Sequence, residues 1–173
     1  MKNLLEYSER LKHLQRTGWV RKGIKQPETV ASHSWQMALM ALQLSGLMHT
    51  FGEKYDFDKV IKLCLCHDLA ESIIGDITPE EEIYSNKNTL EEQAMLSLAE
   101  HADFSIAYNL LKEYNANQTM EAKLANDLDK VDMYAQALAY EKKYPNKDLR
   151  EFKEHAIRCI QTKMGLAILN DLR

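Results

Sequence analysis

Residues 61–77 of the 173-residue chain read IKLCLCHDLAESIIGDI. The first six residues are apolar apart from one lysine, which is typical of a helix that packs into a core. This run ends on His67-Asp68, so the chain places an ionisable pair at the end of a segment that should be buried. Burial of an unpartnered charge is costly, and the pair therefore needs a compensating partner.

Two interpretations of this pair stay open from the residues alone. In the commoner one, His67 ends a core helix and bonds to Asp68. In the other, both side chains bind a divalent ion, since imidazole nitrogen and carboxylate oxygen are good ligands for first-row metals. Glu71 and Asp76 follow closely, and such dense carboxylates repel one another unless cations or protons neutralise them. If one helix runs from Asp58, as N-cap, to residue 72, Glu71 lies one turn after His67 on the same face, which favours a metal site with an acid/base carboxylate beside it.

The rest of the chain has helical periodicity, and only 6 Gly and 3 Pro interrupt it. We expect helices over about residues 4–16, 28–49, 58–72, 90–101, 105–114, 121–143 and 148–170. Between them we expect an irregular segment at 17–27, a break at 49–52 and a turn at 75–79. No segment alternates like a strand. The sequence therefore predicts one compact all-α domain over residues 1–173, a bundle of about six to eight helices.

Composition excludes several classes of function. The chain has 22 Lys and Arg against 26 Asp and Glu, a net charge of −4 and a pI near 5.9, so we expect no nucleic-acid partner. No stretch resembles a transmembrane helix or a secretory signal, so we expect no membrane association. The cysteines, Cys64, Cys66 and Cys159, are odd in number and irregularly spaced, which suits a reducing compartment. We expect a cytoplasmic protein.

Further candidate ligands lie elsewhere in the chain. His33 continues the apolar stripe of the helix predicted at 28–49, and Asp127, Asp129 and Asp132 form an acidic patch on the long helix. A solvated helix face is the ordinary explanation for aspartates in such a position. Helical geometry puts Asp127 somewhat nearer to the apolar face than Asp129, although both flank it.

Several strings resemble a known family. They are RTGWV at 16–20, PETVASHSW at 27–35, HDLAESIIGDI at 67–77, EAK at 121–123 and DLDK at 127–130. Together they resemble the HD-domain metal-dependent phosphohydrolases, and most closely their small 5′-deoxynucleotidase branch. The resemblance covers about residues 4–143; the string at 67–77 is the specific one, and the C-terminal helix at about 148–170 adds little.

The resemblance implies a metal site. It assigns as ligands of one divalent ion the residues His33, His67, Asp68 and Asp129. Asp129 falls on the family's last aspartate, and Asp127 remains its rival. Two imidazoles and two carboxylates suit Mn²⁺, Co²⁺, Fe²⁺ or Mg²⁺ better than an ion that prefers thiolates. A second ion near Glu71 and Asp76 stays open.

The resemblance also implies roles in catalysis and substrate binding. Glu71 matches a carboxylate that acts in proton transfer, and Asp76 matches one that faces the substrate or a second ion. Trp19 matches an aromatic residue that holds the nucleotide. Bacterial members carry an arginine directly before this tryptophan, whereas residue 18 here is glycine. Arg16 or Arg21 would therefore contact the phosphate and steady the phosphoryl oxygens, in a loop that holds basic residues and no acid.

The function that the resemblance implies is metal-dependent hydrolysis of (deoxy)nucleoside 5′-monophosphates to nucleoside and phosphate, by a homodimer. One alternative is another phosphoester substrate, such as guanosine tetraphosphate, a nucleoside triphosphate or a dinucleotide. The other is a metal- or nucleotide-binding module without catalysis. The presence of Glu71 beside the ligand set favours an enzyme, since binding alone has less need of an acid/base group.

Overall fold

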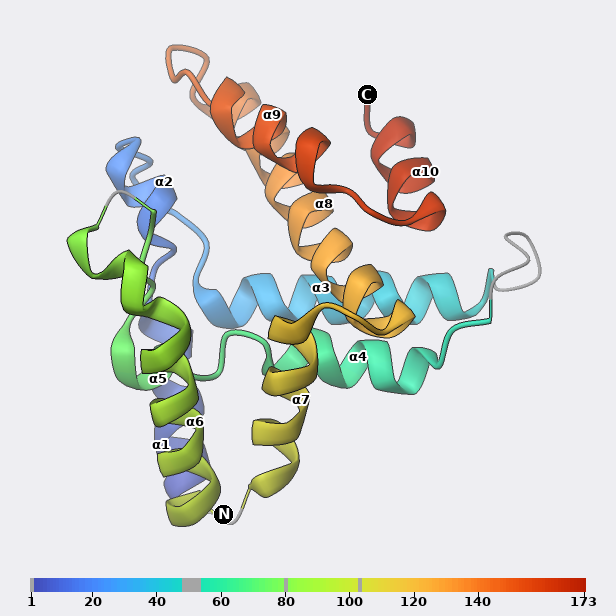
Figure 1. Cartoon of the computed structure of the whole chain (residues 1–173). Coiled ribbons are helices and arrows are strands. Elements are labelled where there is room, and N and C mark those ends of the chain that lie inside the picture. Colours follow the sequence, from blue (N-terminus) through green and yellow to red (C-terminus); the bar gives the residue numbers. More distant parts are fainter. Residues whose placement is uncertain (1, 48–53, 80, 103) are drawn as a thin grey trace.

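Helices make up the regular structure of the computed structural model, which describes residues 2–47, 54–79, 81–102 and 104–173 (Figure 1). Within these residues the only β pairing is an isolated bridge between Gln15 and Thr29. The predicted all-α class is confirmed. No helix in the described parts of the chain is long and apolar enough to cross a membrane.

The elements follow one another as α1 (Lys2–His13), α2 (Thr17–Arg21), α3 (Val30–Ser45), α4 (Phe57–Cys66), α5 (Glu71–Ile74), the 3-10 helix η2 (Glu82–Asn86), α6 (Lys87–Ala102), α7 (Ser105–Ala116), α8 (Met120–Lys143), α9 (Arg150–Cys159) and α10 (Lys163–Asp171). Eight of these described α-helices have nine residues or more. The two short ones, α2 and α5, are additions to the predicted set.

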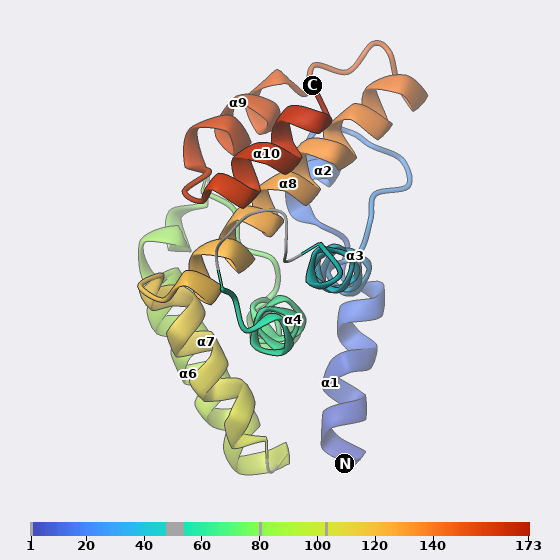
Figure 2. The ribbon, with the colours of Figure 1, turned by 90° about the vertical axis from the view of Figure 1, so that its right-hand side faces the viewer.

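Helices α3 and α4 lie side by side at the centre, and α8 packs across both (Figures 1 and 2). Viewed end-on to α3 and α4, α1 lies on one side of the pair, and α6 and α7 lie on the other (Figure 2). Helices α9 and α10 both pack on α8, and the start of α10 lies against Asp127 in the first half of that helix. The long helix therefore connects the central pair to the C-terminal helices.

Two buried apolar clusters meet along α8. The first includes Met37, Leu63 and Leu128 and fills the space between α3, α4, α6, α7 and the start of α8. The second includes Trp19 and Tyr134 and lies under α2, α9 and α10. The acidic patch of α8 falls where these clusters adjoin, and all three of its aspartates are buried rather than solvated.

The helix predicted at 58–72 is interrupted, and this part of the prediction is wrong. It is capped by Asp56, whose side chain accepts from Lys59 N, rather than by Asp58, and it ends at Cys66. The ring of His67 donates from Nδ1 to the carbonyl oxygen of Cys64. In an unbroken α-helix this carbonyl would accept from the backbone N–H of Asp68 instead. The chain then continues through tighter i→i+3 hydrogen bonds into α5.

The helix predicted at 148–170 is also divided, into α9 and α10. The N-terminus of α10 is capped by Thr162, and the buried carboxylate of Asp127 accepts from the backbone of Gln161 and Thr162. Helix α3 begins behind a capping box formed by Thr29 and Ser32. It ends at Ser45, and the break predicted at 49–52 lies outside the described residues.

Candidate active site

Two buried histidine rings face the same point. His33 lies in the first turn of α3, and its Nδ1 donates to Oδ2 of Asp132 over 2.6 Å. His67 follows α4, and its Nδ1 donates to the Cys64 carbonyl over 2.9 Å. The ring centroids are 5.3 Å apart. Because both Nδ1 atoms are engaged, the Nε2 atoms are left over, and neither has a hydrogen-bond partner of good geometry among the described residues.

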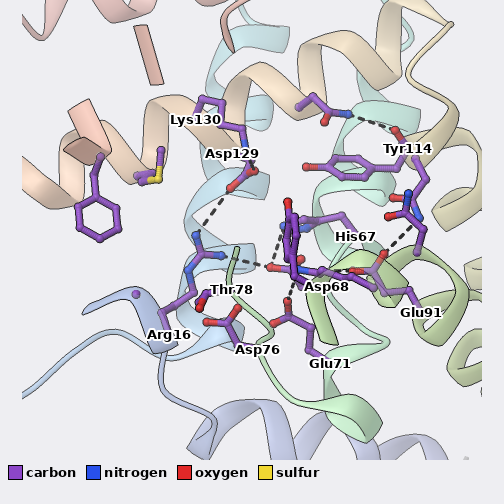
Figure 3. A pocket seen from close by; sticks show the side chains of 18 of the residues that line it. Arg16, His67, Asp68, Glu71, Asp76, Thr78, Glu91, Tyr114, Asp129 and Lys130 are labelled. Carbon is purple, nitrogen blue, oxygen red and sulfur yellow. Dashed lines mark hydrogen bonds and ion pairs between the residues drawn. The ribbon is translucent and has the colours of Figure 1, made fainter. Parts of the chain in front are cut away.

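Two carboxylates approach these free nitrogen atoms. Oδ1 of Asp129 lies 3.2 Å from Nε2 of His33, and Oδ2 of Asp68 lies 3.0 Å from Nε2 of His67. Candidate ligand atoms of His33, His67 and Asp129 all lie within 4.8 Å of one another. Asp68 lies outside this set of three, but its Oδ2 is 3.9 Å from Nε2 of His33. The four predicted ligands thus come close together from α3, from the turn after α4 and from α8. Figure 3 shows three of them, His67, Asp68 and Asp129.

Asp127 lies elsewhere. Its oxygens accept hydrogen bonds from Gln161 N, Thr162 N and the Thr162 hydroxyl, at 2.6–2.8 Å. A Cβ atom on Gly165 would collide with this carboxylate, so α10 approaches α8 closely at that point. The structure therefore brings Asp129 to the histidines and Asp127 to the start of α10.

The residues present fit a divalent cation. Unpaired buried imidazole nitrogens next to carboxylate oxygens form the donor set that first-row ions prefer. Burial opposes ionisation of Asp129, but Lys130, His33 and Arg16 hold the pKa of its carboxyl well below the usual range. Burial and Arg16 oppose the charged form of His33, yet Asp129 and Asp132 raise the pKa of its imidazole to about 10. The site thus favours a positive charge at this point, whether proton or metal.

Arg16 reaches the same carboxylates from the start of α2. Its Nη1 donates to Oδ2 of Asp68 over 3.3 Å, and its Nη2 lies 3.8 Å from Oδ1 of Asp129 (Figure 3). Arg21 instead lies 3.4 Å from Oε1 of Glu81 and is not among the described residues that line the cavity. Of the two candidate phosphate contacts, Arg16 is therefore the one that faces the histidines.

A cavity of about 310 Å³ opens in front of this group. Its wall carries the basic side chains of Arg16, Lys87 and Lys130 and aromatic surface from Trp19 and Phe152. It also carries carboxylates, those of Asp68, Glu71, Asp76, Glu91 and Asp129. A mixture of charged and apolar lining suits a ligand with one anionic end and one apolar end.

Glu71 is buried at the edge of the cavity. Its Oε1 lies 3.4 Å from Nζ of Lys87, and its Oε2 has no hydrogen-bond partner among the described residues. Burial raises the pKa of the Glu71 carboxyl well above its ordinary value, and Asp68 and Asp76 add to this effect. Although the predicted single helix is absent, Glu71 and His67 still line the same cavity.

Asp76 holds the beginning of α2. Its Oδ2 accepts from the backbone N–H of Thr17 over 2.6 Å, and its carbonyl oxygen accepts from the Thr17 hydroxyl over 2.8 Å. The preceding residue, Gly75, has φ +81°, a conformation that side chains disfavour and that turns the chain toward α2. Asp76 lines the cavity as predicted, and it also fixes the helix that carries Arg16 and Trp19.

Trp19 is almost entirely enclosed, with 1% of its surface exposed. Its Nε1 donates to Oε1 of Glu28 over 2.7 Å. The ring of Phe152 lies against it, with centroids 4.2 Å apart, and Tyr140 meets it edge-on. Trp19, the residue predicted to hold the nucleotide, therefore lies behind the ring of Phe152 in the cavity wall.

Sequence reasoning gave no role to several residues of the site. Asp132 was visible as part of the acidic patch, and its place three residues after Asp129 puts it on the same side of α8. Glu28 also lies close to His33 and Asp132, with candidate ligand atoms of all three within 4.8 Å. No motif in the sequence around Lys87 predicts its place in the site, because this residue reaches Glu71 through the packing of α6 on α5.

Comparisons with known proteins identify the family of the chain. The family model described as HD domain matches residues 8–166. The 5′-deoxynucleotidase HDDC2 of Dictyostelium discoideum is 38% identical over 151 residues, covering 82% of this chain and 80% of the relative. The 5′-deoxynucleotidase hdd1 of Schizosaccharomyces pombe is 34% identical, covering 97% and 86%. The crystal structure of the PH0347 protein of Pyrococcus horikoshii OT3 superimposes with a TM-score of 0.86 at 33% identity, covering 99% and 98%.

Proposed function

This chain belongs to the HD domain family, and we propose that it is a metal-dependent 5′-nucleotidase that hydrolyses deoxynucleoside 5′-monophosphates to nucleoside and phosphate. The similarity to curated 5′-deoxynucleotidases over most of both chains supports the choice of substrate. A phosphate monoester is a dianion near neutral pH, so its hydrolysis requires a site that offsets negative charge.

One observation carries the proposal. Among the described residues, the Nε2 atoms of His33 and His67 have no hydrogen-bond partner, and both are buried beside the carboxylates of Asp68 and Asp129. His67, Asp68 and Asp129 line the cavity together with Arg16. Unpaired buried nitrogens destabilise a fold unless a ligand uses them. We assign these two histidines and two aspartates as ligands of one divalent ion: Mn²⁺, Co²⁺, Fe²⁺ or Mg²⁺.

When bound there, a divalent ion lowers the pKa of a water ligand and polarises a phosphate oxygen. The residues around it orient the reactants. Arg16 donates to the phosphoryl oxygens from the cavity wall, and Asp76 holds α2 so that the guanidinium stays in place. Glu71 transfers a proton, either from the attacking water or to the leaving 5′-oxygen. Lys87 lies beside the Glu71 carboxyl, so a second ion near Glu71 and Asp76 would compete with this ammonium group.

Phosphate release from metal-stripped protein tests the proposal. The substrates are 5′- and 3′-deoxynucleoside monophosphates and 5′-ribonucleoside monophosphates, with Mn²⁺, Co²⁺, Fe²⁺ or Mg²⁺ restored one at a time. We expect metal-dependent release from 5′-monophosphates, and loss of both bound metal and release in His67→Ala and Asp68→Ala. Full turnover by His67→Ala would contradict the metal site.

A second set of substrates separates the alternatives. Nucleoside triphosphates, guanosine tetraphosphate and dinucleotides are tested on the same samples. Turnover of these compounds alone would show that the site is catalytic and the proposed substrate wrong. Metal binding without turnover of any substrate would indicate a binding module.

We also propose that the chain forms a homodimer through α3. The sixteen residues of α3 include no Asp, Glu, Lys or Arg. Even so, Trp35, Leu39 and Leu42 on one side are exposed by 61%, 47% and 57%. An uncharged apolar stripe can meet its own copy across a two-fold axis without charge repulsion. Light scattering should give twice the 20.0 kDa chain mass for the wild type and the single mass for Leu39→Glu.

A cytoplasmic location is the last part of the proposal. The three cysteines are free, and Cys64 and Cys66 are buried too far inside the structure to pair with another chain. Free thiols are typical of proteins in reducing compartments. Cell fractionation with a tagged chain should recover it with cytoplasmic markers, and recovery with secreted markers would contradict this location.

A further inference from the structure

The cavity has a charged end and an apolar end, and two helices lead from one to the other. Trp19 of α2 follows Arg16, the residue just before this helix, by three positions, and on α8 Met133 follows Asp129 by four. Each interval is about one helical turn, so on both helices an apolar cavity-lining residue lies one turn beyond a charged one. Phe152 of α9 lies at the apolar end, packed against the cluster that contains Trp19 and Met133.

The indole of Trp19 has almost no free surface. Its exposed fraction is 1%, its Nε1 is bound to Glu28, and the ring of Phe152 lies on it at 4.2 Å with a tilt of 35°. A ligand in the cavity therefore reaches little of the indole. Phe152 is only partly buried and lines the cavity, so its ring is the aromatic surface that a ligand meets.

Gly18 leaves room for this ring. A Cβ atom at residue 18 would lie 3.1 Å from Cε1 and 3.5 Å from Cζ of Phe152. Outside the chain neighbours and the backbone of α2, it would come within 4 Å of no other residue that the structure describes. A side chain at this position would therefore push on Phe152 alone. The ring position is fixed by Trp19 beneath it and by the bare backbone of Gly18 beside it.

We propose that Phe152 is a specificity-determining residue that packs against the base of the bound nucleotide, while Trp19 supports Phe152 from behind. This inference rests on the proposed 5′-nucleotidase function. With the phosphate near Arg16, a nucleoside that extends along α2 and α8 reaches the apolar end, where α9 supplies the ring. Stacking of a base on an aromatic side chain tolerates any base because every base has a π-face, so Phe152 selects for a base without selecting which one.

The test compares two substrates that differ only in the base. One is a deoxynucleoside 5′-monophosphate, and the other is 2-deoxyribose 5-phosphate, which has the sugar and phosphate alone. The measured quantity is the ratio of the two kcat/KM values. Phe152→Leu should lower this ratio about tenfold through KM for the nucleotide, since loss of a base–aromatic stack weakens binding by this order. Phe152→Tyr keeps a ring and should keep the ratio near the wild-type value.

Gly18 supplies a matched second variant. Gly18→Ala should lower the ratio in the wild-type chain by displacing the ring, and should have little further effect in a Phe152→Leu chain, because the two residues act through one contact. An unchanged ratio in Phe152→Leu, or equal loss on both substrates, would overturn the inference and leave the ring a packing residue.

Binding without turnover distinguishes a failure of this inference from a failure of the proposed function. The chain has two tryptophans, so Trp35→Phe leaves Trp19 as the only fluorescent indole. Titration of that variant with a deoxynucleoside 5′-monophosphate should change Trp19 fluorescence. The further substitution Phe152→Leu should raise the nucleotide concentration at the midpoint about tenfold. If no substrate is hydrolysed but this response holds, the proposed activity is wrong and base contact by Phe152 stands. Equal midpoint concentrations in the Phe152→Leu and parent chains would overturn the contact as well.

Discussion

The Nδ1 atom of His33 lies 2.6 Å from Oδ2 of Asp132, and both side chains are buried. A hydrogen bond of this kind selects the tautomer of the imidazole and keeps Nε2 free of a proton when a metal is bound. Asp132 therefore orients the His33 ring toward the proposed metal site, and among the described residues it is not grouped with the candidate ligand atoms of His67 and Asp129. The Nδ1 atom of His67 is held in the same way by the backbone carbonyl of Cys64, which a side-chain substitution does not remove.

Replacement of Asp132 by asparagine should weaken metal affinity by about 10–100-fold, as for other residues that orient a histidine ligand. The amide keeps the shape of the side chain but loses the charge that favours the ring orientation. Metal content after dialysis against a graded series of chelator concentrations measures the effect. Equal metal content in Asp132→Asn and the wild type would show that the backbone of α3 alone orients His33.

Replacement of Glu71 by glutamine should leave the metal bound and lower kcat by about 10²–10⁴-fold, the range for loss of a positioned acid or base. Glutamine fills the same space and cannot exchange a proton. Glu91→Gln is the matched control, because it removes a second carboxylate that lies 3.5 Å from the same Lys87 ammonium. Loss of the metal in Glu71→Gln would make this residue a ligand, and equal losses in both variants would assign the effect to Lys87.

Substitution of Arg16 should lower kcat/KM far more than substitution of Arg21. Arg16→Lys keeps the charge but loses the planar group that reaches two carboxylates, and we expect kcat/KM to fall about 10²–10³-fold, as for removal of one donor to a developing oxyanion. Arg21→Lys should change kcat/KM less than about threefold, since an exposed ion pair contributes little. Steady-state kinetics on one nucleotide gives both values, and the reverse order would transfer the phosphate contact to Arg21.

Asp127 and Asp129 can be separated by stability and metal content. Asp127→Ala leaves the start of α10 without its acceptor and should lower the free energy of unfolding by about 1–3 kcal/mol without metal loss. Asp129→Ala should lose the metal. Urea denaturation and metal analysis on the same samples measure both, and metal loss in Asp127→Ala alone would exchange the two roles.

Gly165 provides an independent check of the Asp127 contact. Alanine is a better helix former than glycine by about 1 kcal/mol, yet its Cβ at residue 165 would collide with the Asp127 carboxylate. Gly165→Ala should therefore destabilise the wild-type chain, and should do so much less in an Asp127→Ala chain. Additive losses in the double variant would show that the two residues do not meet.

Metal affinity should rise with pH. In the metal-free protein, Asp129 and Asp132 raise the pKa of His33 to about 10 against the opposing effect of burial, so a proton occupies the ring near neutral pH. The ion must displace this proton, and below the pKa the apparent affinity should rise by up to about tenfold per pH unit. Titration calorimetry between pH 6.5 and 8.5, chosen as roughly the range where the protein stays folded, measures the slope; a flat profile would mean that His33 is already neutral.

The helical class and the meeting of His33, His67, Asp68 and Asp129 could be foreseen from periodicity and from the resemblance. The end of α4 at Cys66 could not, because it depends on a hydrogen bond from the His67 ring to the Cys64 carbonyl. Local propensity favours a continued helix there, and a side chain overrides it.

Asp127 and Trp19 show a different limit. The helical wheel correctly placed Asp127 near the apolar face, but its partners are residues 161 and 162, far along the chain. Trp19 is enclosed by Phe152, which approaches only after α9 folds back on α8. Periodicity describes which side of a helix is buried, and it contains no information about which distant segment covers that side.

The proposed ligands come from α3, from the turn after α4 and from α8, three segments that also meet through packing and through the His33–Asp132 hydrogen bond. An ion held by all three would act as a cross-link that exists only in the folded chain. By mass action, an ion at 100 times its dissociation constant adds about 2.7 kcal/mol to folding. The melting temperature of the stripped protein should therefore climb in the order in which the site prefers the added ions. Thermal scans would then rank the metals before any substrate is known.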